Sequence, residues 1–101
     1  MESREKILIV DDERLNIDTL VFVLKDRYEL VVAKNGTEAL KRVQTEAPPD
    51  LVLLDIVMPD LDGFEVCRRI KGDPATAEIP VIFISAKRDV EAVSKVLATL
   101  P

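Results

Sequence analysis

Four short runs of apolar, largely β-branched residues recur along the chain. They occupy residues 6–10 (KILIV), 28–33 (YELVVA), 51–55 (LVLLD) and 81–85 (VIFIS). Runs of this length and composition are typical of β-strands. The first, third and fourth are continuously apolar rather than alternating, which predicts strands that are buried on both faces of a parallel sheet.

Segments with helical spacing separate the predicted strands. In each of them apolar residues recur every three or four positions, as on one face of an α-helix. The four sets are Ile17, Leu20, Val21 and Leu24; Ala39, Leu40 and Val43; Phe64, Cys67 and Ile70; and Val90, Val93, Leu97 and Leu100. Strand and helix therefore alternate four times, and we predict an α/β fold with a doubly wound parallel sheet covered by helices.

The size and composition of the chain suit one small domain. With 101 residues, of which 48% are apolar, it can form one modest core but not two. We therefore expect a single domain over residues 1–101. No apolar run approaches the ~20 residues that cross a bilayer, and no signal peptide is readable, so we expect no membrane association. The single cysteine, Cys67, agrees with a reducing compartment such as the cytoplasm.

The charged and titratable residues exclude several classes of function. Fourteen basic and nineteen acidic side chains give a net charge of −5. No dense Lys/Arg cluster is present, so we expect no direct nucleic-acid binding. The chain has no histidine, which excludes a phosphohistidine carrier, a histidine general base and a histidine-ligated zinc site. Any chemistry must therefore use carboxylates, hydroxyls and amines.

Polar residues stand at the ends of three predicted strands. Asp11 and Asp12 follow the first strand, Asp55 ends the third and Ser85 ends the fourth. The carboxyl ends of parallel strands meet at one edge of a sheet, where a doubly wound fold binds its ligand. Two carboxylates ~4 Å apart repel by about 4 kcal/mol at an effective dielectric constant of ~20. The cluster therefore predicts a bound divalent cation, and oxygen-only ligands favour magnesium.

The same residues can be assigned roles in phosphoryl transfer. Magnesium beside a carboxylate neutralises charge on the phosphoryl oxygens. Asp55 stands alone at a strand end and is the candidate nucleophile, whereas the adjacent Asp11 and Asp12 suit metal ligation. The Ser85 hydroxyl could donate to a phosphoryl oxygen. Each residue also has a structural interpretation that stays open, because Asp and Ser often cap helices or begin turns.

Three segments resemble the receiver domain of response regulators in two-component signalling. They are KILIVDDE, LVLLDIVMPDLDGFEV and IPVIFISA, which contain an acidic pair, an Asp followed by Met-Pro and Gly, and a Ser-Ala pair. The resemblance runs from Lys6 to about Leu97. It implies a flavodoxin-like receiver fold with strand order 2-1-3-4. It also implies a phosphoacceptor module of a phosphorelay, and not an enzyme.

The resemblance also implies roles for individual residues. Asp55 would accept a phosphoryl group from a sensor histidine kinase or a small phosphodonor. Mg²⁺ would be held by Asp11, Asp12, Asp55 and the backbone carbonyl of Val57. A downstream output domain or protein would be the second partner. In the same comparison Ser85 would contact the phosphoryl group, Ala86 would leave room for it, and Met58, Pro59 and Gly63 would shape the loop after the acceptor.

The chain departs from the family pattern near its end. Similar receivers continue into a fifth strand, with an aromatic switch residue and a lysine followed by proline, and a fifth helix. None of these is recognisable here, so we expect a receiver domain that is truncated at its carboxyl end. Lys87 lies two residues after Ser85, at a position that tunes phosphoryl lifetime in the family; as a structural residue it is a solvated charge at a helix start.

Without a fifth strand, the run IPVIFIS at residues 79–85 would be an edge of the sheet. An uncharged edge strand invites pairing with another chain. We therefore expect a homodimer through the fourth strand and the last helix. The alternative is a monomer with a frayed carboxyl end.

Two other functions compete with the phosphoacceptor interpretation. A haloacid-dehalogenase-type phosphatase also has a nucleophilic Asp and magnesium on a parallel sheet, but it carries a second acid two residues later, where this chain has Val57. A receiver-like interaction module with impaired phosphorylation is favoured by the missing lysine. The intact acidic pair weighs against it.

Overall fold

The computed structural model, described over residues 4–99, alternates strands and helices along the chain as predicted. The predicted stripe residue Leu100 lies outside this range, and the Lys87 side chain is also outside the description. The predicted strands agree with the observed ones to within one residue at each end. The elements are β1 (Lys6–Val10), α1 (Arg14–Leu24), β2 (Glu29–Ala33), α2 (Gly36–Val43), β3 (Leu51–Asp55), α3 (Gly63–Gly72), β4 (Val81–Ile84) and α4 (Lys87–Thr99).

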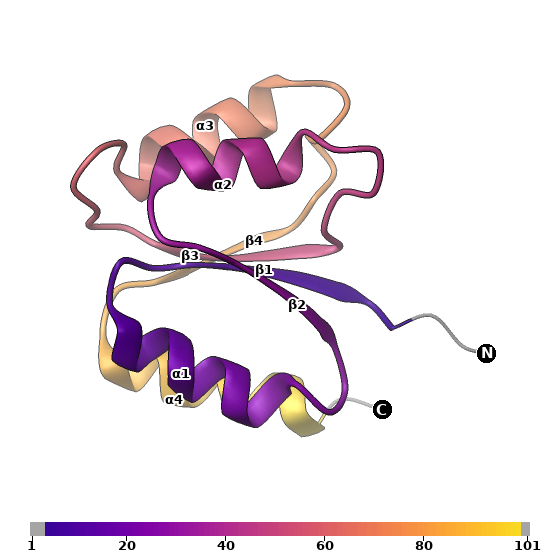
Figure 1. The fold of residues 1–101 in the computed structure, drawn as a ribbon. Coiled ribbons are helices and arrows are strands. Elements are labelled where there is room, and N and C mark those ends of the chain that lie inside the picture. Colours follow the sequence, from indigo (N-terminus) through magenta and orange to yellow (C-terminus); the bar gives the residue numbers. More distant parts are fainter. Residues whose placement is uncertain (1–3, 100–101) are drawn as a thin grey trace.

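The four strands form one parallel sheet in the order β2-β1-β3-β4, which confirms the predicted order. Helices α2 and α3 cover one face of the sheet and α1 and α4 cover the other, as Figure 1 shows. This arrangement is the doubly wound, flavodoxin-like receiver fold. Within residues 4–99, no helix combines the length and the hydropathy that a bilayer crossing requires.

Two apolar clusters fill the space between the sheet and its helices. Side chains on β1 alternate between them, so this strand is buried on both faces, as its continuous apolar sequence predicted. The cluster under α2 and α3 includes Leu8, Val10, Val52, Leu54, Val66 and Ile70; the cluster under α1 and α4 includes Ile7, Ile9, Leu20, Leu24, Leu53, Ile84, Val90 and Leu97.

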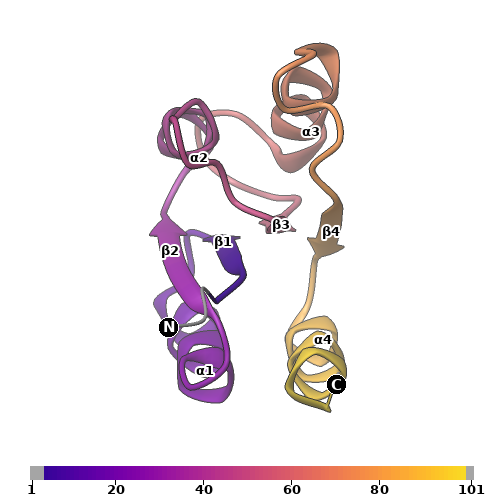
Figure 2. The same cartoon turned by 90° about the vertical axis from the view of Figure 1, so that its right-hand side faces the viewer.

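Strand β4 is less buried than its apolar sequence predicted. Ile82 and Phe83 are 37% and 36% exposed, because within the described residues β4 pairs only with β3 and stands at the edge of the sheet. Figure 2 shows β4 between α3 and α4 along one side of the molecule. The predicted core residue Phe64 is also 60% exposed, and Val66 takes the core position on α3 instead.

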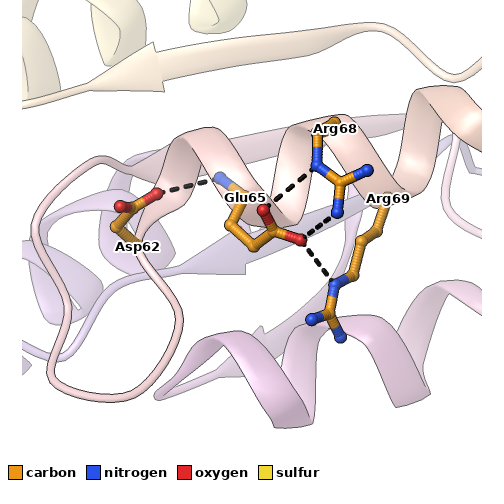
Figure 3. Close-up of polar contacts among 4 residues, drawn as sticks. All are labelled: Asp62, Glu65, Arg68 and Arg69. Atoms are coloured by element: carbon orange, nitrogen blue, oxygen red, sulfur yellow. Dashed lines mark hydrogen bonds and ion pairs between the residues drawn. The ribbon is translucent and has the colours of Figure 1, made fainter.

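Helix α3 begins at a well-defined cap. The Asp62 carboxylate accepts a hydrogen bond from the Glu65 backbone N–H at 2.8 Å, as Figure 3 shows, which satisfies one of the free amides of the first turn. The Glu65 carboxylate accepts from the Arg68 and Arg69 side chains one turn further on. These two arginines lower the pKa of Glu65 to about 2, so the carboxylate stays ionised at the helix start.

Candidate functional site

Three carboxylates meet at the carboxyl ends of β1 and β3. Asp11 and Asp12 follow β1 directly, and Asp55 is the last residue of β3. One carboxylate oxygen from each residue lies within 4.8 Å of the other two. Asp11 is only 1% exposed, whereas Asp55 is half-buried and Asp12 is exposed. The topology thus brings the three acids together, as the sequence predicted.

Asp11 is fixed by local hydrogen bonds. Its Oδ1 accepts from the Glu13 backbone N–H at 2.9 Å, and its Oδ2 accepts from the Asn16 side-chain amide at 3.1 Å. The N-cap of α1 is Glu13, so Asp11 shapes the turn before the helix and is not its cap. Asn16 was missed by the sequence reasoning. Its only signal is its place in the first turn of the helix after the acidic pair.

Asp55 carries the most perturbed titration within the acidic cluster. Burial raises its pKa to about 6, with a further contribution from the negative charge of Asp11. The Val57 backbone N–H, which donates to Asp55 Oδ1 at 3.3 Å, opposes this rise. The repulsion between the Asp55 and Asp11 carboxylates is relieved when Asp55 binds a proton or when a cation binds to the cluster. The site offers only oxygen ligands, a donor set that fits a hard ion such as Mg²⁺.

The acidic cluster opens into a pocket of about 390 Å³. This pocket brings together Asp55 of β3 with Ser85 and Ala86, which follow β4. Its lining therefore includes residues from three strand ends, and also residues that the sequence reasoning did not select. The full lining is Asp12, Glu13, Leu15, Asn16, Asp55, Val57, Ser85 and Ala86.

The Ser85 hydroxyl is engaged by a residue that was also missed. It donates to Asp89 Oδ2 at 3.0 Å, and the backbone N–H groups of Ser85 and Ala86 donate to the same oxygen at 3.1 Å each. The spacing from Ala86 to Asp89 is that of a capping box, in which an acid inside the helix reaches back to the N-cap amide. That spacing was a readable signal, although Ala86 lacks the hydroxyl of the usual motif.

A glycine closes the loop after Asp55. The Gly63 N–H donates to the Ile56 carbonyl at 2.7 Å. A Cβ atom on Gly63 would lie 2.3 Å from the Asp55 backbone oxygen and 2.8 Å from the Ile56 Cα. Only glycine allows this close approach of two backbones. Met58 in the same loop is buried in the core and Pro59 is exposed, so Met58 and Gly63 fix the loop.

Asp60 ties this loop to the start of α2. Its Oδ1 accepts from the Gly36 N–H at 3.0 Å, and its Oδ2 accepts from the Thr37 N–H at 3.0 Å and the Thr37 hydroxyl at 2.7 Å. These bonds, with that from the Thr37 hydroxyl the strongest, hold the pKa of Asp60 well below its usual range. Sequence reasoning missed Asp60, because its partners lie far away in the chain.

Comparisons with known proteins identify the family and the fold. Residues 7–99 match the family model of the response regulator receiver domain. The response regulator PleD of Caulobacter vibrioides is 44% identical over 82 residues, which are 80% of this chain and 18% of PleD. The chain therefore spans less than a fifth of the length of that relative.

Solved structures agree with this match. The N-terminal domain of a response regulator receiver protein from Methanoculleus marisnigri JR1 is similar with a TM-score of 0.75 and 46% identity, covering 81% of this chain and 67% of that one. The phosphorylated cyanobacterial phytochrome response regulator RcpA is similar with a TM-score of 0.78 and 28% identity, covering 97% and 77%. The chain belongs to the receiver domain family of two-component response regulators.

Proposed function

We propose that this receiver domain accepts a phosphoryl group on Asp55 from a sensor histidine kinase or from a small phosphodonor such as acetyl phosphate. The observation that carries the proposal is the meeting of Asp11, Asp12 and Asp55 within 4.8 Å, beside a pocket that Ser85 and Ala86 also line. The similar protein RcpA has been crystallised in a phosphorylated form. As the partner of a histidine kinase, the chain would act in the cytoplasm and pass its signal to an output domain or protein.

A magnesium ion would be held by Asp11, Asp12, Asp55 and the Val57 backbone carbonyl. Two observations support this assignment: the carboxylate oxygens converge, and the ligand atoms are all oxygens. When bound, the ion would neutralise negative charge on the phosphoryl oxygens. It would also favour the ionised form of Asp55, whose pKa burial raises to about 6.

The transfer step would use Asp55 as the nucleophile. One carboxylate oxygen forms a bond to phosphorus, while the P–N bond of the phosphohistidine breaks and its electron pair returns to the imidazole. With acetyl phosphate, the P–O bond to the acetyl group breaks and acetate leaves. The product in both cases is an acyl phosphate on Asp55. The Ser85 hydroxyl would donate to a phosphoryl oxygen, and the small Ala86 side chain would leave room for the group.

Mass spectrometry after treatment with acetyl phosphate and magnesium tests this proposal. We expect one added phosphoryl group on the wild-type chain and none on Asp55→Asn. Asp26→Asn is a matched control, because it removes the charge of an exposed acid before β2 and should be labelled like the wild type. Equal labelling of wild type and Asp55→Asn would contradict the assignment.

We also propose that the chain forms a homodimer through β4 and α4. The outer edge of β4 is flanked by an apolar groove of about 180 Å³ on the α4 side and by the Phe64 and Phe83 rings, 5.3 Å apart, on the α3 side. Residues 79–86 carry no charge that would oppose pairing. A second copy would present the same strand and groove, as a two-fold interface requires. The groove is lined by Ile82, Ala92, Val93, Val96 and Leu97.

Light scattering coupled to size exclusion tests the dimer. We expect a dimer of the wild-type chain at micromolar concentration and a monomer of Val96→Glu, which places a charge in the groove. Phe22→Glu, at an exposed apolar position on α1, should remain dimeric. A monomeric wild-type chain at high micromolar concentration would contradict this proposal and leave the phosphoacceptor proposal untouched.

A further inference from the structure

One carboxylate oxygen accepts three hydrogen bonds at the connection between β4 and α4. Asp89 Oδ2 accepts from the Ser85 hydroxyl, the Ser85 N–H and the Ala86 N–H, at 3.0 to 3.1 Å. Asp89 is half-buried in the first turn of α4, and these bonds, led by that from the Ser85 N–H, lower its pKa. An ionised acid is also favourable at this end of a helix. Asp89 is therefore an anion that accepts from donors in the loop between β4 and α4.

The same donors border the pocket of the acidic cluster. Ser85 and Ala86 line this pocket together with Asp55, whereas Asp89 is not part of the lining. The Ser85 hydroxyl has a single hydrogen, so it can donate fully to only one acceptor at a time. In this structure that acceptor is Asp89. A phosphoryl group on Asp55 would need the same hydrogen.

We propose that Asp89 is a positioning residue that competes with the phosphoryl group on Asp55 for the Ser85 hydroxyl. Without a phosphoryl group on Asp55, the Ser85 hydroxyl donates to Asp89. When Asp55 is phosphorylated, the hydroxyl leaves Asp89 and donates to a phosphoryl oxygen. The inference rests on the proposed phosphorylation of Asp55. It adds a residue in α4 that opposes loading of the site.

The competition has a defined thermodynamic consequence. A ligand that requires a released Ser85 binds with an apparent affinity that is reduced by the fraction of molecules in which Ser85 is free. Hydrogen bonds to a charged acceptor are roughly twice as strong as those to a neutral one. Weakening the acceptor at Asp89 should therefore increase the released fraction and tighten binding of a phosphoryl mimic.

The start of α4 does not depend on Asp89 alone. The Ala86 carbonyl accepts from the Asp89 N–H at 2.9 Å and from the Val90 N–H at 3.2 Å, and both bonds are made by the backbone. Val90 is anchored in the core. When Ser85 turns away, the first turn of α4 can therefore remain helical while the Asp89 carboxylate becomes hydrated.

The test is a titration of the magnesium-loaded protein with beryllofluoride, followed by nitrogen-15 NMR of the Ser85 and Ala86 amides. We expect Asp89→Asn, which keeps the shape and removes the charge, to bind beryllofluoride about three- to tenfold more tightly than wild type. Glu91→Gln is the matched control, because it removes an exposed acid from the same helix. It should bind like wild type. The dispersion of the spectra verifies that each variant is folded.

A second background separates competition for the hydroxyl from a general effect of charge. In Ser85→Ala the hydroxyl is missing, so the gain from Asp89→Asn should shrink. A gain of the same size in both backgrounds would overturn the proposal, because Asp89 would then act through its charge alone. Normal binding by wild type with no gain in Asp89→Asn would also overturn it. If wild type binds no beryllofluoride at all, the proposed function itself fails and the inference fails with it.

Discussion

The two loops that border the acidic pocket are held in place very differently. The β3–α3 loop, residues 56–62, is fixed at several independent points: the close backbone contact at Gly63, the buried Met58, and the bonds from Asp60 to the start of α2. The β4–α4 loop, residues 85–86, is held by one carboxylate oxygen of Asp89 and by backbone hydrogen bonds to the Ala86 carbonyl from the first turn of α4. Both loops follow neighbouring strands and line the same pocket.

The difference separates a positioning role from a switching role. In the proposed function Asp55 would keep its place relative to Asp11 and Asp12 in every state, and several contacts hold its loop. Ser85 would need to change its hydrogen-bond partner when the site is loaded, and a side-chain hydroxyl held by one acceptor can do so at small cost. Substitutions in the first loop should therefore affect stability most, and substitutions in the second should affect ligand binding most.

The largest expected effect is that of Gly63→Ala. The added Cβ would lie 2.3 Å from the Asp55 backbone oxygen, so either the loop or the end of β3 must move. We expect a loss of about 3 kcal/mol or more in the free energy of unfolding. Gly72→Ala is the control, because a Cβ at Gly72 in the same helix would meet nothing within 4 Å. Urea unfolding of both variants decides this point, and equal stabilities would refute the rigid loop.

Magnesium should stabilise the protein by linkage at the acidic cluster. At 100 times its dissociation constant, an ion that binds only the native state adds ~2.7 kcal/mol to the free energy of unfolding. Thermal melts with and without millimolar magnesium measure this effect. Asp12→Ala should lose most of the shift, whereas Asp26→Asn should retain it. An unchanged wild-type midpoint would remove the metal site.

Asp60→Asn should weaken the attachment of the first loop to α2. Both carboxylate oxygens of Asp60 accept hydrogen bonds, and an amide offers only one acceptor. Because folding lowers the pKa of Asp60, its contribution is present above the usual carboxyl pKa and is lost as the pH falls below it. We expect a lower melting midpoint at pH 7, and a smaller difference from wild type in acid. A pH-independent difference would contradict this account.

Asp55→Asn should change the free energy of unfolding by less than the substitutions above. In metal-free buffer it should raise this free energy, whereas they lower it. Folding raises the pKa of Asp55 from 3.8 to about 6, so ionisation of Asp55 disfavours the native state. The contribution of Asp55 to the free energy of unfolding is fully present below pH 3.8 and is lost as the pH rises through about 6. After allowance for solvent screening, we expect the variant to be more stable than wild type by about 1 kcal/mol at pH 7.5. The difference should vanish near pH 4 in paired urea titrations.

The sequence predicted the fold well because local apolar patterns indicate which segments are buried. The continuous apolar runs of residues 6–10 and 51–55 specify central strands, and their order brings Asp11, Asp12 and Asp55 to one edge. The edge position of the fourth strand was predicted, but the exposure of Phe83 was not. A continuously apolar run predicts burial on both faces, and its sequence does not indicate how much of each face the neighbouring helices cover.

The contacts of individual polar side chains were the hardest part of the site to predict. The bonds of Asp60 join two loops that are distant in the chain, and no local pattern encodes such a pair. The Ser85 hydroxyl was expected to face a phosphoryl group, but in this structure it donates to Asp89. A motif identifies which residues take part in a site. It does not identify every hydrogen-bond partner of those residues.

The central place of β1 in the sheet has a consequence for synthesis of the chain. β1 is the first strand to leave the ribosome, yet one of its two neighbours, β3, begins only at Leu51. Until β3 emerges, one edge of KILIV has no partner strand. Parallel pairings of this long range form slowly. The nascent chain is therefore expected to need a chaperone between the emergence of β2 and that of β3.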